Sequence, residues 1–417
     1  MCVADKKFPK VLLWGHSFDN YSGMGITLTN IFYNWPKECI AISANEINTK
    51  LCDDTRPCAQ YIPWSSNVSI SKRERKRTKS DAIKDVLRPI VKMFDFREIL
   101  RKPHISTSVV DEVKQFAPDV IFCSLGSLAS MKTLLELNRL LPNIPIVLYI
   151  VDDWPNTRHL DKRFRFVWKQ QYKQYFCKVL NISKGYYSIC KHMSDAYFEQ
   201  YGKKFYPIHN PADLGYWDSI KPGTKYGDEI HSILYVGKIN RETSDNIHDM
   251  CRVVDRLNKQ GIKVVFDVYS PDYSSQGHKF SKYKNSHILP AVDHNQIPLL
   301  TKQYKYLFLT LGFSTISRKY ARLSMPTKLS EYMASGCPTI LYAPKDIALS
   351  QYVAEHDAAI MCFEHNIECL YDKLVLLITN DSESNRVKEN ACKLAKQHDI
   401  HSVRTEFENS IKEILKG

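Results

Sequence analysis

The sequence of 417 residues lacks long hydrophobic runs. No stretch approaches the roughly 18 consecutive apolar residues that cross a membrane as a helix. The opening MCVADKKFPK passes directly into the apolar run 11–14, which is far too short for the core of a signal peptide. These absences lead us to expect a cytoplasmic protein.

Paired cysteine motifs are also missing. The twelve cysteines form no C-x-x-C pair and are scattered over a long chain. Cys123, Cys190 and Cys337 stand in apolar surroundings, so we expect mostly buried, reduced thiols. A bridge between Cys52 and Cys58 is the alternative.

Positive charge is abundant. Lys and Arg number 58 against 45 Asp and Glu, which gives a net charge of +13. Such an excess indicates an anionic partner: nucleic acid, an acidic membrane surface or phosphorylated substrates. The run 71–80, SKRERKRTKS, holds six basic residues, and an apolar helical pattern follows it. This combination is typical of an element that binds an anionic membrane surface, with a solvated loop and a core-packed helix as the alternative.

Apolar strand patterns alternate with helical patterns in two series. The polar stretch 219–229 lies between the two series, and we interpret it as a linker. This alternation predicts an α/β protein with two doubly wound parallel sheets. Ligands of such sheets bind beyond the carboxyl ends of the strands, so a cleft between two such edges suits the joining of two substrates. We place the domains at residues 1–212 and 213–395, with a C-terminal helix at 396–417 that can pack back on the first domain.

The expected elements are short and regular. Strands are expected at residues 10–14, 119–124, 145–151, 187–190 and 206–209, and then at 232–236, 263–269, 306–310, 339–342 and 358–361. Helices are expected at residues 26–33, 134–141, 193–201, 246–259, 294–303, 367–379 and 382–415.

The segment 324–338, SMPTKLSEYMASGCP, is the most informative motif. Pro326 suits the start of a helix, and Gly336 suits its end. A helix start offers free backbone N–H groups and a positive dipole end to a phosphate, and Lys328 adds a full charge. Glu331 lies one turn further, where a carboxylate can bind the two hydroxyls of a ribose. The layout predicts a nucleotide-diphosphate site; an ordinary amphipathic helix is the alternative.

Several motifs together resemble a known family. They are the glycine-bearing loop after the first strand, H-N-P at 209–211, ILYVGKINRE at 233–242 and PTKLSEYMASGCPTI at 326–340. This combination is similar to the GT-B fold retaining glycosyltransferases, nearest to the large bacterial group that builds capsule, O-antigen and other surface polysaccharides. The resemblance implies two Rossmann-like domains facing a central cleft, and a nucleotide-diphosphate sugar as donor without a further cofactor.

The resemblance also implies roles for individual residues. Gly23 and Gly25 match the N-terminal loop that faces the donor diphosphate, although a simple turn also explains them. Gly237 and Lys238 match a glycine and a basic residue that meet the diphosphate and steady the leaving group. Arg241 is a second basic candidate nearby, and either charge can instead belong to an exposed loop.

The helix motif carries further implied roles. Thr327 and Lys328 match the pair that contacts phosphate, and Glu331 matches the ribose-binding glutamate. The better-known family motif has another glutamate, whose position here holds Leu323. The resemblance therefore leaves an acidic contact to the donor sugar missing or supplied elsewhere.

A second departure lies in YIVDDWPNTRH at 149–159. Many relatives carry a histidine where this chain has Asp152 and Asp153. A carboxylate there can hydrogen-bond a sugar hydroxyl or accept the proton of the attacking acceptor, and capping a turn is the alternative. An Asp pair also invites a metal, but the family uses lysine and a helix start instead, so we expect no metal.

These observations predict a hexosyltransferase-type glycosyltransferase at the inner face of the membrane. Its acceptor would be a lipid-linked or growing glycan, and retention of configuration follows from the resemblance alone. Lys238 and Lys328 would stabilise the leaving diphosphate. A sugar-nucleotide epimerase on the same fold is the first alternative. A basic nucleic-acid-binding protein is the second, but no such motif is present, so we expect no nucleic-acid partner.

Overall fold

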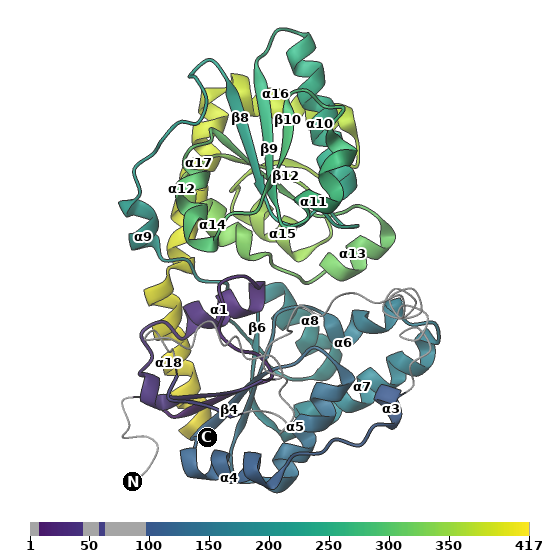
Figure 1. Ribbon diagram of the computed structural model, residues 1–417, viewed down its shortest axis with the longest axis vertical. Coiled ribbons are helices and arrows are strands. Elements are labelled where there is room, and N and C mark those ends of the chain that lie inside the picture. The colour runs from purple at the N-terminus through teal and green to yellow at the C-terminus, as the bar shows by residue number, and fades with distance from the viewer. Residues whose placement is uncertain (1–7, 45–57, 63–96, 417) are drawn as a thin grey trace, which may run out of the picture. The chain divides into compact units, whose positions relative to one another are not determined.

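The computed structural model describes residues 8–44, 58–62 and 97–416, and the chain forms two compact units (Figure 1). Unit 1 comprises residues 1–208 and 406–417, and unit 2 comprises residues 209–405. The boundaries expected from the sequence were 212 and 395. The basic run 71–80 and the stretch after it lie outside the described residues.

Unit 1 contains a parallel sheet of seven strands in the order β3-β2-β1-β4-β5-β6-β7. Strand β1 pairs in parallel with both β2 and β4, so that Val11 lies between Ile40 and Val120. The strands are β1 (Val11–Trp14), β2 (Ile40–Ser43), β3 (Gln60–Tyr61), β4 (Val120–Ser124), β5 (Ile146–Ile150), β6 (Ser183–Ser188) and β7 (Tyr206–Pro207).

Helices connect these strands. They are α1 (Gly23–Ile31), η2 (Lys37–Cys39), α3 (Arg97–Leu100), α4 (Thr107–Phe116), α5 (Leu128–Leu140), α6 (Trp154–Thr157), η4 (Arg158–Asp161), α7 (Arg165–Ile182) and α8 (Lys191–Tyr201). Helix α4 shows how local sequence sets them: the Ser106 hydroxyl accepts from the Val109 N–H at its start. Its apolar positions Val109, Val113 and Phe116 recur at helical spacing and are buried.

The last helix, α18 (Ile400–Lys416), contributes to the core of unit 1. The ring of Phe407 is fully buried and lies 5.1 Å from Phe32, 5.4 Å from Phe122 and 5.5 Å from Tyr187, measured between ring centroids. Edge-to-face packing of this kind adds roughly 0.5–1.5 kcal/mol per pair beyond the burial of apolar area. The C-terminal segment is therefore part of the first folding unit.

Unit 2 contains a parallel sheet of six strands in the order β10-β9-β8-β11-β12-β13. The strands are β8 (His231–Val236), β9 (Val264–Ser270), β10 (Ser286–Pro290), β11 (Tyr306–Thr310), β12 (Thr339–Tyr342) and β13 (Ile360–Cys362). Side chains of β8, β9, β11 and β12 form one core with α10 and α16.

Helices flank this sheet on both sides (Figure 1). They are α9 (Leu214–Ser219), α10 (Ser244–Lys259), α11 (Tyr273–Gln276), η5 (Gly277–Phe280), η6 (His294–Gln296), α12 (Ile297–Thr301), α13 (Thr315–Ala321), α14 (Thr327–Ser335), α15 (Ala348–Glu355), α16 (Ile367–Thr379), α17 (Asp381–Ala395) and η7 (Lys396–His398). No helix within the described ranges is both long and apolar enough to cross a bilayer.

The predicted fold class, two doubly wound Rossmann-like sheets, is confirmed. Strands β2, β3 and β10 were not predicted, and the helix expected at 382–415 is interrupted at Asp399. The polar stretch 219–229, interpreted as a linker, lies inside unit 2. There the backbone N–H groups of Gly223 and Lys225 bond to the carbonyls of Lys302 and Gln303.

A buried carboxylate holds this polar stretch to the sheet. The side chain of Asp267 on β9 is fully buried and accepts from Lys225 Nζ at 2.6 Å and from the Tyr226 hydroxyl at 2.8 Å. Tyr304 also donates to Asp267, and His287 Nδ1 lies 2.8 Å from its second oxygen. A buried charge is tolerated only when it is paired and hydrogen-bonded in this way.

We expect Asp267→Asn to lower the free energy of unfolding by about 2–3 kcal/mol, because it removes one partner of a buried ion pair whose lysine is partly exposed. Urea denaturation measures this difference. Asp346→Asn is the matched control, since Asp346 pairs with Arg318 at the surface and should cost less than about 1 kcal/mol. Equal costs for the two variants would contradict the assignment.

The same carboxylate predicts a dependence on pH. Burial raises the pKa of Asp267, but hydrogen bonds from Lys225, Tyr304, His287 and Tyr226 outweigh burial and hold the pKa below its usual value. A carboxyl with a lowered folded-state pKa stabilises the protein above its unfolded value and loses that contribution as the pH falls. Wild type should therefore lose more stability than Asp267→Asn between about pH 5 and pH 2.

Candidate functional site

Helix α14 begins and ends as its sequence predicts. Pro326 is the N-cap, with φ −62° and ψ 139°, and Gly336 ends the helix in the left-handed region at φ 71°. Leu329 and Met333 are buried and fix one face of the helix. Because a proline side chain cannot accept a hydrogen bond, the N-cap side chain does not satisfy the N–H groups of the first turn. Thr327 and Lys328 occupy that turn and are half-buried.

Lys328 reaches the end of strand β8. Its Nζ donates to the Tyr235 hydroxyl at 3.1 Å and lies 4.2 Å from the centre of the Tyr235 ring. The same hydroxyl donates to the backbone carbonyl of Lys238 at 3.0 Å. Tyr235 therefore joins the ammonium group of α14 to the loop that follows β8.

Gly237 lies directly beside this ammonium group. A Cβ atom at this position would lie 2.5 Å from Lys328 Nζ, and its φ of +147° is strained for any other residue. Its N–H bonds to the Tyr269 carbonyl at 2.9 Å. The backbone conformation favours glycine here, and the structure brings two predicted site residues, Gly237 and Lys328, together.

Tyr332 fixes the helix to the strand from the other side. Its hydroxyl accepts from the Val236 N–H at 3.1 Å, and its side chain is buried. Burial raises the pKa of Tyr332 well above its usual value, so the group stays neutral. Tyr235 and Tyr332 together set the position of α14 against the carboxyl end of β8.

The loop after β8 presents the other predicted basic residues. Lys238 is exposed, while its carbonyl accepts from the Thr243 hydroxyl at 2.9 Å and the Ile239 N–H donates to Asp272 at 2.9 Å. Arg241 is also exposed. It lines a separate pocket of about 140 Å³ together with Glu242, Asp245, Asn246, Gly312, Phe313, Ser314, Ser317 and His365.

Glu331 forms an ion pair that the sequence did not suggest. Its Oε1 lies 2.7 Å from His294 Nε2, and the two side chains are 12% and 30% exposed. Burial lowers the pKa of His294, but the hydrogen bond and the charge of Glu331 outweigh burial and raise it above its usual value. The pair fixes one of the two carboxylate oxygens of Glu331.

The glycine loop of unit 1 is shaped by Asp19. Its carboxylate accepts from the N–H groups of Tyr21 and Ser22 at 3.0 and 2.7 Å. Gly23 begins α1, and Ser22 caps this helix by accepting from the Gly25 N–H at 3.0 Å. A Cβ on Gly25 would lie 2.1–2.4 Å from the Asp19 carboxylate atoms, so packing alone accounts for this glycine.

The Asp pair divides into two different environments after β5. Asp153 is 2% exposed, and its Oδ1 accepts from Asn156 Nδ2 at 2.7 Å and from the Tyr197 hydroxyl at 2.9 Å. Asp152 is exposed. Asp153 therefore ties α6 to α8 within unit 1, and Asp152 is the carboxylate of the pair that solvent reaches.

The structure adds Tyr235, Tyr332 and His294 to the candidate site. Tyr235 lies in the quoted motif ILYVGK, but no sequence pattern relates it to Lys328. His294 and Glu331 are 37 positions apart, so no helical or strand periodicity relates them in the sequence. Leu323, at the position of the missing glutamate, is 5% exposed. Within the described ranges, no cluster of three or more His, Cys, Asp or Glu side chains is placed to hold a metal ion.

Comparison by sequence finds no matching family model and no matching curated protein. Comparison of structures finds Anabaena HepE in complex with UDP and glucose, at 12% identity and a TM-score of 0.64, covering 97% of this chain and 99% of that one. Sucrose-phosphate synthase from Thermosynechococcus elongatus has 10% identity and a TM-score of 0.65, with 98% and 100% covered. A protein assigned as a UDP-N-acetylglucosamine 2-epimerase from Listeria monocytogenes has 11% identity and a TM-score of 0.58, with 98% and 97% covered. At these identities the likeness establishes the fold.

We expect Glu331→Gln to lower the pKa of His294 below its usual value, because burial then acts without the opposing charge. An NMR titration of the imidazole in wild type and variant measures the change. Because the pKa of His294 is raised on folding, its ion pair stabilises the folded protein fully at pH values below the unfolded pKa of about 6.5. This stabilisation is lost as the pH rises through the pKa of the folded protein. An unchanged His294 titration would show that the pair does not form in solution.

Proposed function

We propose that this protein is a glycosyltransferase that moves a sugar from a nucleotide-diphosphate sugar to a glycan or lipid-linked acceptor. The observation that carries the proposal is the first turn of α14, where Lys328 lies against Gly237 and Glu331 with His294 follows one turn later. The similar HepE structure holds UDP and glucose, which supports UDP as the first donor nucleotide to test.

The proposed roles follow from charge and position. The diphosphate lies against the N–H groups that begin α14 and against Lys328, whose charge stabilises the leaving group as the glycosidic bond breaks. Lys238, exposed on the neighbouring loop, adds a second charge, with Arg241 further along. Glu331 accepts hydrogen bonds from the ribose hydroxyls through the oxygen that His294 does not hold.

The acceptor side of the reaction is assigned to unit 1. Asp152 is an exposed carboxylate at the carboxyl end of β5, which suits it to orient a sugar hydroxyl or to accept the proton of the attacking acceptor. Asp153 supports the segment through Tyr197 and Asn156. Retention of configuration remains a prediction from the family resemblance, and so does activity without a metal ion.

A role in surface polysaccharide synthesis is the finer form of the proposal. It rests on the motifs shared with that bacterial group and on the basic run 71–80 with its apolar continuation. Anionic lipids attract each well-placed Lys or Arg by roughly 1 kcal/mol. Peripheral attachment at the inner membrane face would hold the enzyme near lipid-linked acceptors. This part remains a prediction, because the run lies outside the described residues.

An epimerase is the second candidate, because a protein assigned to that activity shares the fold. The two reactions differ in their need for an acceptor. Incubation with UDP-sugars and no acceptor should leave the sugar configuration unchanged apart from slow hydrolysis. Conversion of one UDP-sugar into its epimer would favour the epimerase and overturn the transferase.

Lys328→Ala and Glu331→Ala should each weaken UDP binding by about ten- to a hundredfold, since each removes a charge-assisted hydrogen bond of roughly 1.5–3 kcal/mol. Calorimetric titration with UDP measures the affinity, and thermal unfolding checks the fold. Lys319→Ala, which removes an exposed lysine of the neighbouring helix α13, is the matched control. Wild-type affinity in both test variants would refute the donor site.

Asp152→Asn should lower kcat by about a hundredfold or more with little change in UDP affinity, because the group acts mainly in the transition state. Asp153→Asn should instead lower the free energy of unfolding by about 1–3 kcal/mol, since two buried hydrogen bonds are disturbed. Kinetics and urea denaturation of both variants separate the two effects. Asp195→Asn, at an exposed ion pair on α8, is the control. Normal turnover of Asp152→Asn would remove this residue from the mechanism.

A further inference from the structure

Two cysteines of unit 2 lie in contact with each other. Cys362 ends strand β13 and Cys369 lies in the first turn of α16, and their Sγ atoms are 2.7 Å apart. All ten cysteines within the described ranges are free thiols. A disulfide bond is about 2.05 Å long, so a small movement of the two side chains brings these sulfurs to bonding distance.

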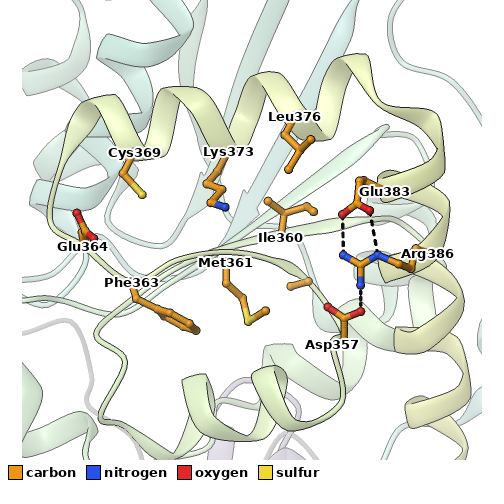
Figure 2. Close-up of a pocket in the computed structure, with 11 residues that line it drawn as sticks. Asp357, Ile360, Met361, Phe363, Glu364, Cys369, Lys373, Leu376, Glu383 and Arg386 are labelled. Atoms are coloured by element: carbon orange, nitrogen blue, oxygen red, sulfur yellow. Dashed lines mark hydrogen bonds and ion pairs between the residues drawn. The ribbon is translucent and has the colours of Figure 1, made fainter.

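The two thiols differ in access. Cys369 lines a pocket of about 400 Å³ formed by β13, α16 and α17, and it projects into this pocket beside Lys373 (Figure 2). Cys362 is fully buried behind it and donates its S–H to Cys369 Sγ. A solute that enters the pocket meets Cys369 first, and Cys362 can react only through Cys369.

Three of the other charged groups of the pocket pair with one another, and Glu364 is a further carboxylate that lines it. Arg386 forms ion pairs with Asp357 and with Glu383, as the dashed lines in Figure 2 show. Lys373 lies one helical turn after Cys369 on α16 and faces the same pocket. Its positive charge suits an anionic thiol reagent, such as the carboxylate-bearing glutathione disulfide.

We propose that Cys369 and Cys362 form a reversible disulfide by exchange with a low-molecular-weight disulfide. The thiolate of Cys369 attacks glutathione disulfide, which breaks the S–S bond and releases one glutathione. The sulfur of Cys362 then displaces the second glutathione from Cys369, and the Cys362 proton leaves with it. The two protein thiols are oxidised by two electrons, and glutathione disulfide is reduced to two glutathione molecules.

The disulfide restrains the loop between the two cysteines. Residues 363–366 join β13 to α16 and carry His365, whose ring stacks on Phe313 at 4.9 Å and whose Nε2 lies 3.1 Å from Asp249 Oδ2. His365 also lines the smaller pocket that contains Arg241. Cross-linking the ends of this loop limits the movements by which His365 leaves that pocket.

The chain offers a clean test, because no Lys or Arg lies between 346 and 372. One tryptic peptide, residues 346–373, therefore contains both cysteines. After the native protein has been incubated with glutathione disulfide and alkylated under denaturing conditions, this peptide should have lost two hydrogen atoms and carry no alkyl group. Dithiothreitol should restore two alkylated cysteines.

Two variants give the order of the steps. Cys362→Ser should stop at the mixed disulfide, with glutathione retained on Cys369. Cys369→Ser should leave Cys362 unreacted until the protein is denatured. Cys177→Ser, at a half-buried cysteine of α7 in unit 1, is the control and should form the disulfide as wild type does.

Three results would overturn the proposal: both cysteines alkylated in treated wild type, stable glutathione on Cys369 of wild type, or reaction of Cys362 in the Cys369→Ser variant. Hydrogen exchange measures the restraint. Amides of residues 363–366 should exchange more slowly in the oxidised protein, and equal rates would contradict the effect on the loop. None of these readouts depends on glycosyl transfer.

Discussion

The candidate site of unit 2 depends on how α14 is held at the carboxyl end of β8. The Tyr332 hydroxyl binds the Val236 N–H, and Lys328 binds the hydroxyl of Tyr235. Both tyrosines are buried, which limits competition from bulk water for these contacts. Gly237 allows the ammonium group to lie against the backbone. If these contacts were lost, the first turn of α14 would no longer share one surface with the loop after β8.

The parallel sheets explain why the candidate groups collect where they do. In a parallel sheet all carboxyl ends lie at one edge, so the residues that follow β5, β8 and β11 emerge at such edges. Asp152 follows β5 in unit 1, and Gly237 and Lys238 follow β8 in unit 2. Buried strands leave little freedom to these positions. The Asp267 network holds the polar segment before β8, so this strand is anchored at both ends.

Local signals in the sequence were sufficient for the fold class and for α14. Pro326 and Gly336 marked the ends of this helix because their backbone conformations are restricted or exceptional. The pairing of His294 with Glu331 had no local signal, since tertiary packing alone brings η6 beside α14. The edge strand β3, with two residues, is too short to show a pattern. The sequence did not distinguish Asp152 from Asp153, because the two residues differ in burial, which depends on tertiary packing.

Under the proposed function, Leu323 leaves unit 2 without an acidic contact to the donor sugar at this position. It is buried, and an unpaired carboxylate at a buried position would cost several kcal/mol or take up a proton. In the proposed function the groups of α14 and its partners bind phosphate and ribose, which every nucleotide sugar of one base shares. In these roles they would provide affinity for the nucleotide and little discrimination between sugars. Because carboxylates select sugars by the positions of their hydroxyls, the proposed function requires a group outside α14 to supply the contact that position 323 lacks. The invariant part of the donor would then depend on unit 2, and the choice of sugar on residues outside α14.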